Sequence, residues 1–116
     1  MMANIEIFNL TKHTINIVDE DNVTILKIES ECYSPEIEIE IFSNGALRGV
    51  PMSKVESIEI RDLPPFKVGI LYIVDFGIAY AARAEGRIIS DLLMAGEPAY
   101  GEDGSFIGYR SLSFFE

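Results

Sequence analysis

The clearest pattern in the chain is a strict alternation of charged and apolar residues over 36–41, where Glu-Ile occurs three times in succession. A period of two places neighbouring side chains on opposite faces of a β-strand, so the isoleucines share one face and the carboxylates share the other. The run follows Pro35 and leads to Asn44-Gly45, a pair that favours a tight reversal. The pattern predicts a half-buried strand that ends near residue 44.

Shorter apolar or alternating runs, bounded by turn residues, predict the remaining strands. The segment 19–22 is typical of a polar hairpin loop, Pro64-Pro65 of an extended connection, and Asp103-Gly104 of a two-residue hairpin turn. Residues 90–96 are expected to form a loop or a short turn. The other predicted strands are 5–10, 14–18, 23–28, 54–60 and 70–74, together with two strand-like runs within 98–115.

The run 70–74 is apolar at every position, which is typical of a strand buried on both faces. It leads into an alanine-rich stretch, the one good helix candidate, predicted near 76–85. Asp75 is placed to accept backbone N–H bonds from the first turn, and Gly86 is placed to end the helix in a left-handed conformation. We therefore expect a mainly β (α+β) fold. It should have seven or eight mostly antiparallel strands and one short helix, arranged as a partly open barrel or a two-layer sheet.

Length and composition indicate a single domain spanning 1–116, because 116 residues of which 48% are hydrophobic suffice for one core. The apolar runs are too short to span a membrane and the first residues lack a secretory signal, which predicts a cytoplasmic protein. Nine basic residues stand against 19 acidic ones, giving a formal net charge of -10. This charge disfavours direct binding to nucleic acid or to anionic membranes and suits a basic protein partner, although an acidic surface more often serves solubility.

Candidate catalytic groups are few. His13 and Cys32, the single histidine and the single cysteine, lie in no local pattern that activates a thiolate. The sequence has no cluster with metal-ligand spacing and no glycine-rich phosphate cradle, so we expect neither a metal nor another cofactor. A nucleophile, a general base and an oxyanion donor cannot be placed together, which favours a protein that is not an enzyme.

One candidate site lies along the expected helix. Tyr80, Arg83 and Arg87 follow the spacing i, i+3, i+7 and would share one edge, which Arg110 could join from a neighbouring strand. Guanidinium groups bind carboxylate or phosphate in a bidentate manner, so this edge could hold a small anionic ligand, for example a nucleotide. The competing interpretation is ion pairing within the chain, with Asp75, Glu85 or Asp91.

A second candidate site is the carboxylate row Glu36, Glu38 and Glu40, with Glu59. Such a row could imitate phosphates and occupy the basic groove of a host protein, with an affinity that falls as salt rises. The competing interpretation is an ordinary solvated sheet face. A third possibility is an assembly component in which the apolar tail 112–115 pairs with a neighbouring subunit of a homo-oligomer.

Three segments resemble a family of small proteins found in bacteria, their phages and mobile elements: 9–17, which begins Asn9-Leu10-Thr11-Lys12-His13, then 71–74 with 79–83, and 102–112. Members begin with an Asn-Leu-Thr-Pro-His motif and end in an Asp-Gly-x-Ile-Gly hairpin; this chain has Lys12 in place of the proline and Asp75 in place of a usual serine. The resemblance implies a phage or mobile-element context and no particular activity. We therefore expect a non-enzymatic accessory protein that acts by binding, for example an anti-defence inhibitor with an acidic surface. Small-ligand binding and structural assembly are the alternatives.

Overall fold

The structure is a computed structural model that describes residues 4–115, apart from the side chains at 56 and 57. It is mainly β with one short helix, which confirms the predicted fold class; ten strands are present in the described residues, where seven or eight were expected. The strands are β1 (Glu6–Asn9), β2 (Ile15–Val18), β3 (Thr24–Ile28), β4 (Glu36–Leu47), β5 (Val50–Arg61), β6 (Ile70–Ile73), β7 (Leu92–Ala95), β8 (Pro98–Tyr100), β9 (Phe106–Tyr109) and β10 (Leu112–Phe114), and the helix is α1 (Phe76–Ala84).

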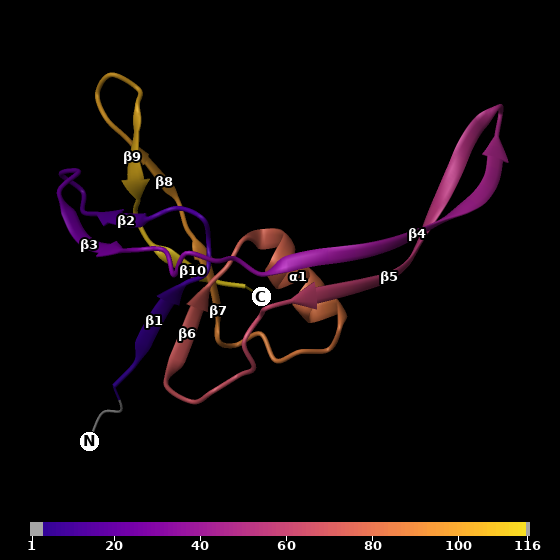
Figure 1. Ribbon diagram of the computed structural model, residues 1–116. Helices are drawn as coiled ribbons and strands as arrows, with labels where there is room; N and C mark the ends of the chain where they lie inside the picture. The colour runs from indigo at the N-terminus through magenta and orange to yellow at the C-terminus, as the bar shows by residue number, and fades with distance from the viewer. Residues whose placement is uncertain (1–3, 116) are drawn as a thin grey trace.

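The strands form three sheets (Figure 1). The first has the order β1-β6-β7-β10, the second the order β3-β2-β9-β8, and the third is the β4-β5 hairpin alone. Four of these seven pairings are antiparallel, and the parallel ones are β1 with β6, β6 with β7, and β2 with β9. The predominance of antiparallel pairs agrees with the prediction. The helix α1 makes the crossover between the parallel strands β6 and β7.

The core lies on both sides of the first sheet. Ile73 and Leu93 pack with Ile15 and Ile17 of the second sheet. The residues that alternate with them in β6 and β7 contact α1 instead, so the first sheet is the middle layer. Within the apolar run 70–74, residues 72–74 are therefore buried between α1 on one face and the second sheet on the other, as the composition of the run predicts. The cluster on the helix side consists of Leu10, Tyr72, Val74, Ile78, Ala79, Ala82, Leu92 and Phe115.

Both ends of α1 follow local rules. The Asp75 carbonyl accepts the N–H groups of Ile78 (3.0 Å) and Ala79 (3.1 Å), but its carboxylate makes no capping hydrogen bond, contrary to expectation. Gly86 adopts φ 84°, the left-handed conformation that the sequence predicted, and its N–H donates to the Arg83 carbonyl at 3.0 Å. The helix thus ends before Arg87.

Both predicted polar turns are present and each is held by an aspartate, but the β8-β9 connection spans residues 101–105 and is longer than the two-residue turn expected at Asp103-Gly104. The Asp19 carboxylate accepts the N–H groups of Asp21 and Val23, both at 2.9 Å, in the β2-β3 turn. The Asp103 carboxylate accepts the N–H (3.0 Å) and hydroxyl (2.6 Å) of Ser105 in the β8-β9 turn, and these hydrogen bonds lower the pKa of Asp103. Side chains that bond their own backbone in this way are why aspartate favours turns.

Two predicted elements differ in the structure. The segment 90–96, expected to be a loop, contains β7, in which Leu92 and Leu93 are buried. The reversal expected at Asn44-Gly45 lies instead at Arg48 (φ 51°) and Gly49 (φ 79°), while Gly45 (φ 75°) sits at an irregularity inside β4. Two consecutive residues with positive φ form the tight turn that matches strand twist. The fourth predicted strand is therefore longer than its alternating core.

The β4-β5 hairpin, which we call the arm (36–61), extends away from the other sheets in Figure 1. The Cα radius of gyration is 18.0 Å, against about 13 Å for a compact chain of this length. The principal extents of 54 × 43 × 25 Å reflect the same elongation. Among the described residues, no helix combines the length and apolar character needed to cross a membrane.

Candidate functional site

The arm has two chemically different faces, because residues opposite each other on paired strands point to the same side. On one face the register places Ile37 opposite Ile60, Ile39 opposite Ile58, and Ile41 opposite Val55. We call this the apolar face. On the other, Glu36 lies opposite Arg61, Glu38 opposite Glu59, and Glu40 opposite position 57. We call this the acidic face, and it contains the whole carboxylate row that the sequence predicted.

The root of the arm rests on α1 through its apolar face. A methyl group added to Gly77 of the helix would lie 3.7 Å from Cδ1 of Ile37, and Ile60 packs against the core cluster that contains Ile78. A helix of nine residues spans about 13 Å, whereas strands of twelve residues span about 40 Å. The helix is therefore too short to cover the arm along its length.

The exposed fraction of the isoleucines rises with distance from α1, which shows where the helix stops covering the apolar face. Ile37, beside the helix, is 38% exposed, Ile39 is 49% exposed and Ile41 is 61% exposed. Val55, which lies opposite Ile41, is exposed as well. Four further large apolar side chains nearer the turn are exposed: Phe42, Leu47, Val50 and Met52.

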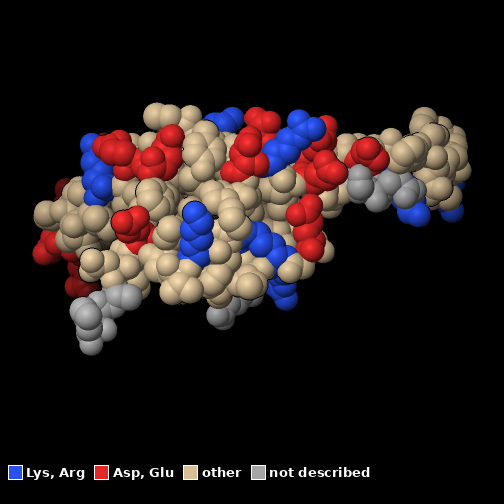
Figure 2. Space-filling view, turned by 60° about the horizontal axis from the view of Figure 1, so that its bottom comes forward, with Lys and Arg blue, Asp and Glu red and all other residues tan. Residues whose placement is uncertain are grey.

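The acidic face is exposed and only partly neutralised. Glu38 and Glu59 face each other across the hairpin, an arrangement of like charges that destabilises a strand pair. The Arg61 guanidinium forms an ion pair with Glu38, and both side chains are more than half exposed. Figure 2 shows acidic side chains gathered near the root of the arm, while its far end carries mostly uncharged residues. The exposed ion pair between Arg61 and Glu38 contributes at most about 1 kcal/mol to the stability of the arm.

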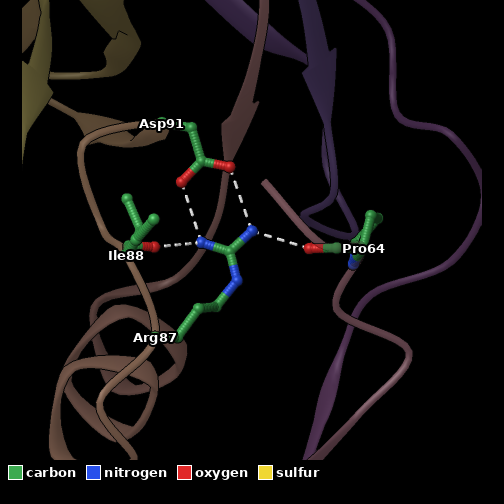
Figure 3. A network of polar contacts seen from close by, with 4 residues as sticks. All are labelled: Pro64, Arg87, Ile88 and Asp91. Atoms are coloured by element: carbon green, nitrogen blue, oxygen red, sulfur yellow. Dashed lines mark hydrogen bonds and ion pairs between the residues drawn. The ribbon is translucent and has the colours of Figure 1, made fainter. Parts of the chain in front are cut away.

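Arg87, predicted as a ligand-binding residue, binds the chain itself (Figure 3). Its Nη1 and Nη2 donate to the two carboxylate oxygens of Asp91 at 2.8 and 3.0 Å. Nη2 also donates to the Pro64 carbonyl at 2.6 Å, and Nη1 donates to the Ile88 carbonyl. Asp91 is 1% exposed. All four Nη hydrogens are thus directed to acceptors of the chain, which is the ion pairing that stood as the alternative to a ligand site.

Tyr80 and Arg83 remain exposed on α1. Tyr80 stacks on Phe76, with ring centroids 6.3 Å apart, and Arg83 has no ion pair with the described residues. The spacing argument that joined them to Arg87 fails because α1 ends at Ala84, one residue before its C-cap. The two residues share a helix edge, but the structure does not extend that edge to Arg87.

Arg110, the fourth predicted ligand-binding residue, lies at the β2-β3 turn. Its guanidinium donates to the Asp19 carbonyl and to Oδ1 of Asn22, the latter at 2.8 Å. It borders a hollow of about 610 Å³ whose lining in the described residues includes Glu20, Asp21 and Glu97 and no residue of α1. An anionic ligand would be repelled by these carboxylates, so the surroundings of Arg110 disfavour the predicted ligand.

Sequence reasoning did not find a second hollow, of about 480 Å³, at the carboxyl ends of β6 and β7. His13, Asp75, Phe76 and Tyr109 contribute to its lining. Ligands commonly bind at this edge of parallel strands. The signal in the sequence was the apolar run 70–74 followed directly by a helix, but without β7 the parallel pair could not be recognised.

The loop that carries His13 is built by the Asn9-to-His13 motif. Asn9 is fully buried; its Oδ1 accepts the N–H (2.9 Å) and hydroxyl (2.6 Å) of Thr11. Its Nδ2 donates to the carbonyls of His13 (2.7 Å) and Ile28 (3.0 Å). The motif therefore has a structural role as a loop clamp that ties the end of β1 to the end of β3. Lys12 is exposed and takes no part in these bonds.

The remaining candidate groups do not converge on a reaction centre. Cys32 is exposed, with its Sγ 3.9 Å from the Ser30 carbonyl, and is not part of the lining of the His13 hollow. Among the side chains that the structure describes, which leave out those at 56 and 57, no group of three or more His, Cys, Asp or Glu could hold a metal ion. Phe115 of the apolar tail is buried in the core, and β10 pairs with β7 of its own chain.

No protein-family model matches the chain, and neither a curated protein nor a solved structure is significantly similar to it.

Proposed function

We propose that this protein is a non-enzymatic binding protein that uses the acidic face of its arm to contact a basic surface of a partner protein. The observation that carries the proposal is the rung of Glu38 and Glu59, two carboxylates that oppose each other on a projecting hairpin. This rung lowers the stability of an arm that is already poorly covered. A cationic partner would relieve the repulsion, so binding and arm stability would be coupled.

The position of the carboxylates supports this choice. They lie on the face of the arm opposite to the one that rests on α1, so the body of the protein does not obstruct them. The net charge of -10 adds a long-range attraction for a basic groove and a repulsion for nucleic acid. In the phage or mobile-element context implied by the family resemblance, such a protein would act in the cytoplasm on a host enzyme, for example as an anti-defence inhibitor.

The alternative of a small anionic ligand held by the arginines has less support. Two of its four residues, Arg87 and Arg110, direct their guanidinium groups to acceptors within the chain. Tyr80 and Arg83 are the part of that site whose side chains remain exposed. We therefore place the binding function on the arm.

The test is affinity capture from a bacterial lysate with quantitative mass spectrometry, using the double variant Glu38→Lys/Glu40→Lys. A matched control, Glu97→Lys/Glu102→Lys, changes the net charge by the same amount at exposed positions outside the arm. We expect the unmodified chain and the control to capture a basic protein that the arm variant loses. The captured amount should fall steeply between about 50 and 500 mM salt. Equal capture by all three proteins would refute the proposal.

A further inference from the structure

The His13 hollow, at the carboxyl ends of β6 and β7, has the size and lining of a small-molecule site. We propose that it binds a small organic cation, whose methylated ammonium group packs against aromatic rings and pairs with the Asp75 carboxylate. Its volume of about 480 Å³ falls within the range of about 300–1,000 Å³ that is typical of ligand pockets. The site shares no residue with the arm, so the inference goes beyond the proposed function and is tested separately.

Three polar side chains of the lining are available to a ligand. The side chains of His13, Asp75 and Tyr109 form no hydrogen bond or ion pair with another described residue. The threonine hydroxyl groups of the lining, in contrast, are already bonded within the chain. The hollow thus differs from the predicted arginine site, where the guanidinium of Arg87 is directed to acceptors of the chain itself.

Aromatic rings line the hollow from two separate elements. Phe106 and Tyr109 belong to β9, and their ring centroids lie 5.1 Å apart at an interplanar angle of 70°, so they form two walls of a corner and not a stack. Phe76 begins α1, and the ring of Phe115 packs against it edge to face at 5.3 Å, which holds it in place. Aromatic rings attract cations to their faces, and several rings around one site are the usual means of recognising a methylated ammonium group.

The charge of the lining determines the sign of the ligand. With His13 neutral, Asp75 carries the single formal charge in the described lining, and the net charge of -10 repels anions from the whole surface. A bare ammonium group would need an acceptor for each of its N–H groups. Methylation replaces these donors with apolar surface, which suits the rings and the side chains of Met94 and Ala95 that also line the hollow.

The test uses choline as the probe and follows the backbone amide resonances of the full-length chain. Choline chloride replaces sodium chloride up to about 50 mM, so that the ionic strength stays constant and general screening does not contribute. The reference compound is the neutral analogue of choline with a tert-butyl group in place of the trimethylammonium group. We expect choline to shift the resonances of 75–77 and 106–109 and to bind at least about tenfold more tightly than the neutral analogue.

Two matched pairs of variants locate the binding energy. Asp75→Asn keeps the shape of the side chain and its preference for a helix N-cap, and should weaken choline binding about threefold or more. Glu85→Gln removes the same charge at the other end of α1 and should change the affinity by less than about twofold. Phe106→Leu should also weaken binding about threefold or more, whereas Phe66→Leu, an exposed ring outside the lining, should not.

Several results would overturn the inference. They are equal affinities for choline and its neutral analogue, shifts without saturation at the highest concentration, and binding that Asp75→Asn weakens no more than Glu85→Gln does. None of these outcomes bears on the arm. Conversely, if Glu38→Lys/Glu40→Lys captured as much partner as the unmodified chain, the proposed function would fail while choline binding could still be observed.

Discussion

Replacing Arg87 with methionine tests how strongly its ion pair with Asp91 holds the molecule together. Methionine keeps an apolar stem of similar reach but provides none of the N–H groups. Asp91, 1% exposed, would keep its carboxylate without that partner, and the Pro64 carbonyl would lose its donor. Removing one member of a buried ion pair costs about 3–5 kcal/mol, which is a large share of the about 5–15 kcal/mol by which domains are stable.

Urea unfolding followed by far-ultraviolet circular dichroism measures this loss. With a typical dependence of about 1–3 kcal/mol per molar urea, we expect the midpoint of Arg87→Met to fall by at least about 1 M. Two variants complete the experiment. Arg83→Met, on the exposed edge of α1, should change the free energy of unfolding by less than about 0.5 kcal/mol. The double variant Arg87→Met/Asp91→Leu should recover much of the loss, because no unpaired carboxylate then remains buried.

The comparison with Arg83→Met decides the outcome. If both single variants shifted the midpoint equally, the contacts of Arg87 with Asp91 and Pro64 would contribute nothing beyond an ordinary surface substitution. The guanidinium would then be available to a ligand, and the prediction of Arg87 as a ligand-binding residue would regain its basis.

Three further predictions concern the body of the protein. Asn9→Leu leaves the donors and acceptors of the loop clamp unpaired and should lower the free energy of unfolding by at least about 2 kcal/mol in urea titrations; an unchanged value would contradict the clamp. Burial, then the charge of Asp91, raise the pKa of Tyr72, so stability should decline as pH rises above the usual tyrosine pKa of about 10. Absorbance titration should show that Tyr72→Phe removes a tyrosine that ionises above pH 10, and loss of one that ionises at or below pH 10 would refute this. Gly108→Ala places a methyl group 2.5 Å from the Asn16 carbonyl and should destabilise more than Gly104→Ala, whose methyl group meets open space; the reverse order in thermal denaturation would be the contrary result.

The sequence predicted well those elements whose pattern is local. The Glu-Ile alternation identified both faces of the arm, because a period of two is a property of any strand regardless of what it packs against. Gly86 identified the end of α1, since only its neighbours in the chain determine whether a left-handed residue is needed. The fold class followed from the sum of such local patterns.

Prediction failed where distant residues decide. Leu92 to Ala95 lack the β-branched composition of a strand, and the segment becomes β7 because β6 and β10 pair with it from either side. Asn44-Gly45 is a strong turn signal, yet the hairpin continues past it to Arg48 and Gly49. At that point the additional pairing between β4 and β5, which continues to Leu47 and Val50, outweighs the local turn propensity.

The candidate sites divide in the same way. The carboxylate row is a strand pattern, and the structure keeps Glu36, Glu38 and Glu40 on one face with Glu59 opposite Glu38. The predicted arginine site applied helical spacing to Arg87, which lies beyond the end of α1. It also included Arg110, whose position depends on the second sheet and could not be derived from local sequence. The carboxylate that binds Arg87 was named as one of three candidates, and burial of Asp91 selects it.

The position of the arm in the chain bears on the rate of folding. Strands β1 and β6 pair in parallel although roughly sixty residues separate them, so the first sheet forms only after a long loop has closed, and such topologies fold slowly. The arm accounts for less than half of that loop, and because closure entropy grows only with the logarithm of length, removing it would lower the cost by about 0.5 kcal/mol. The arm therefore places almost no kinetic burden on the sheet that carries it, and its length and sequence are free to follow the demands of the surfaces it meets.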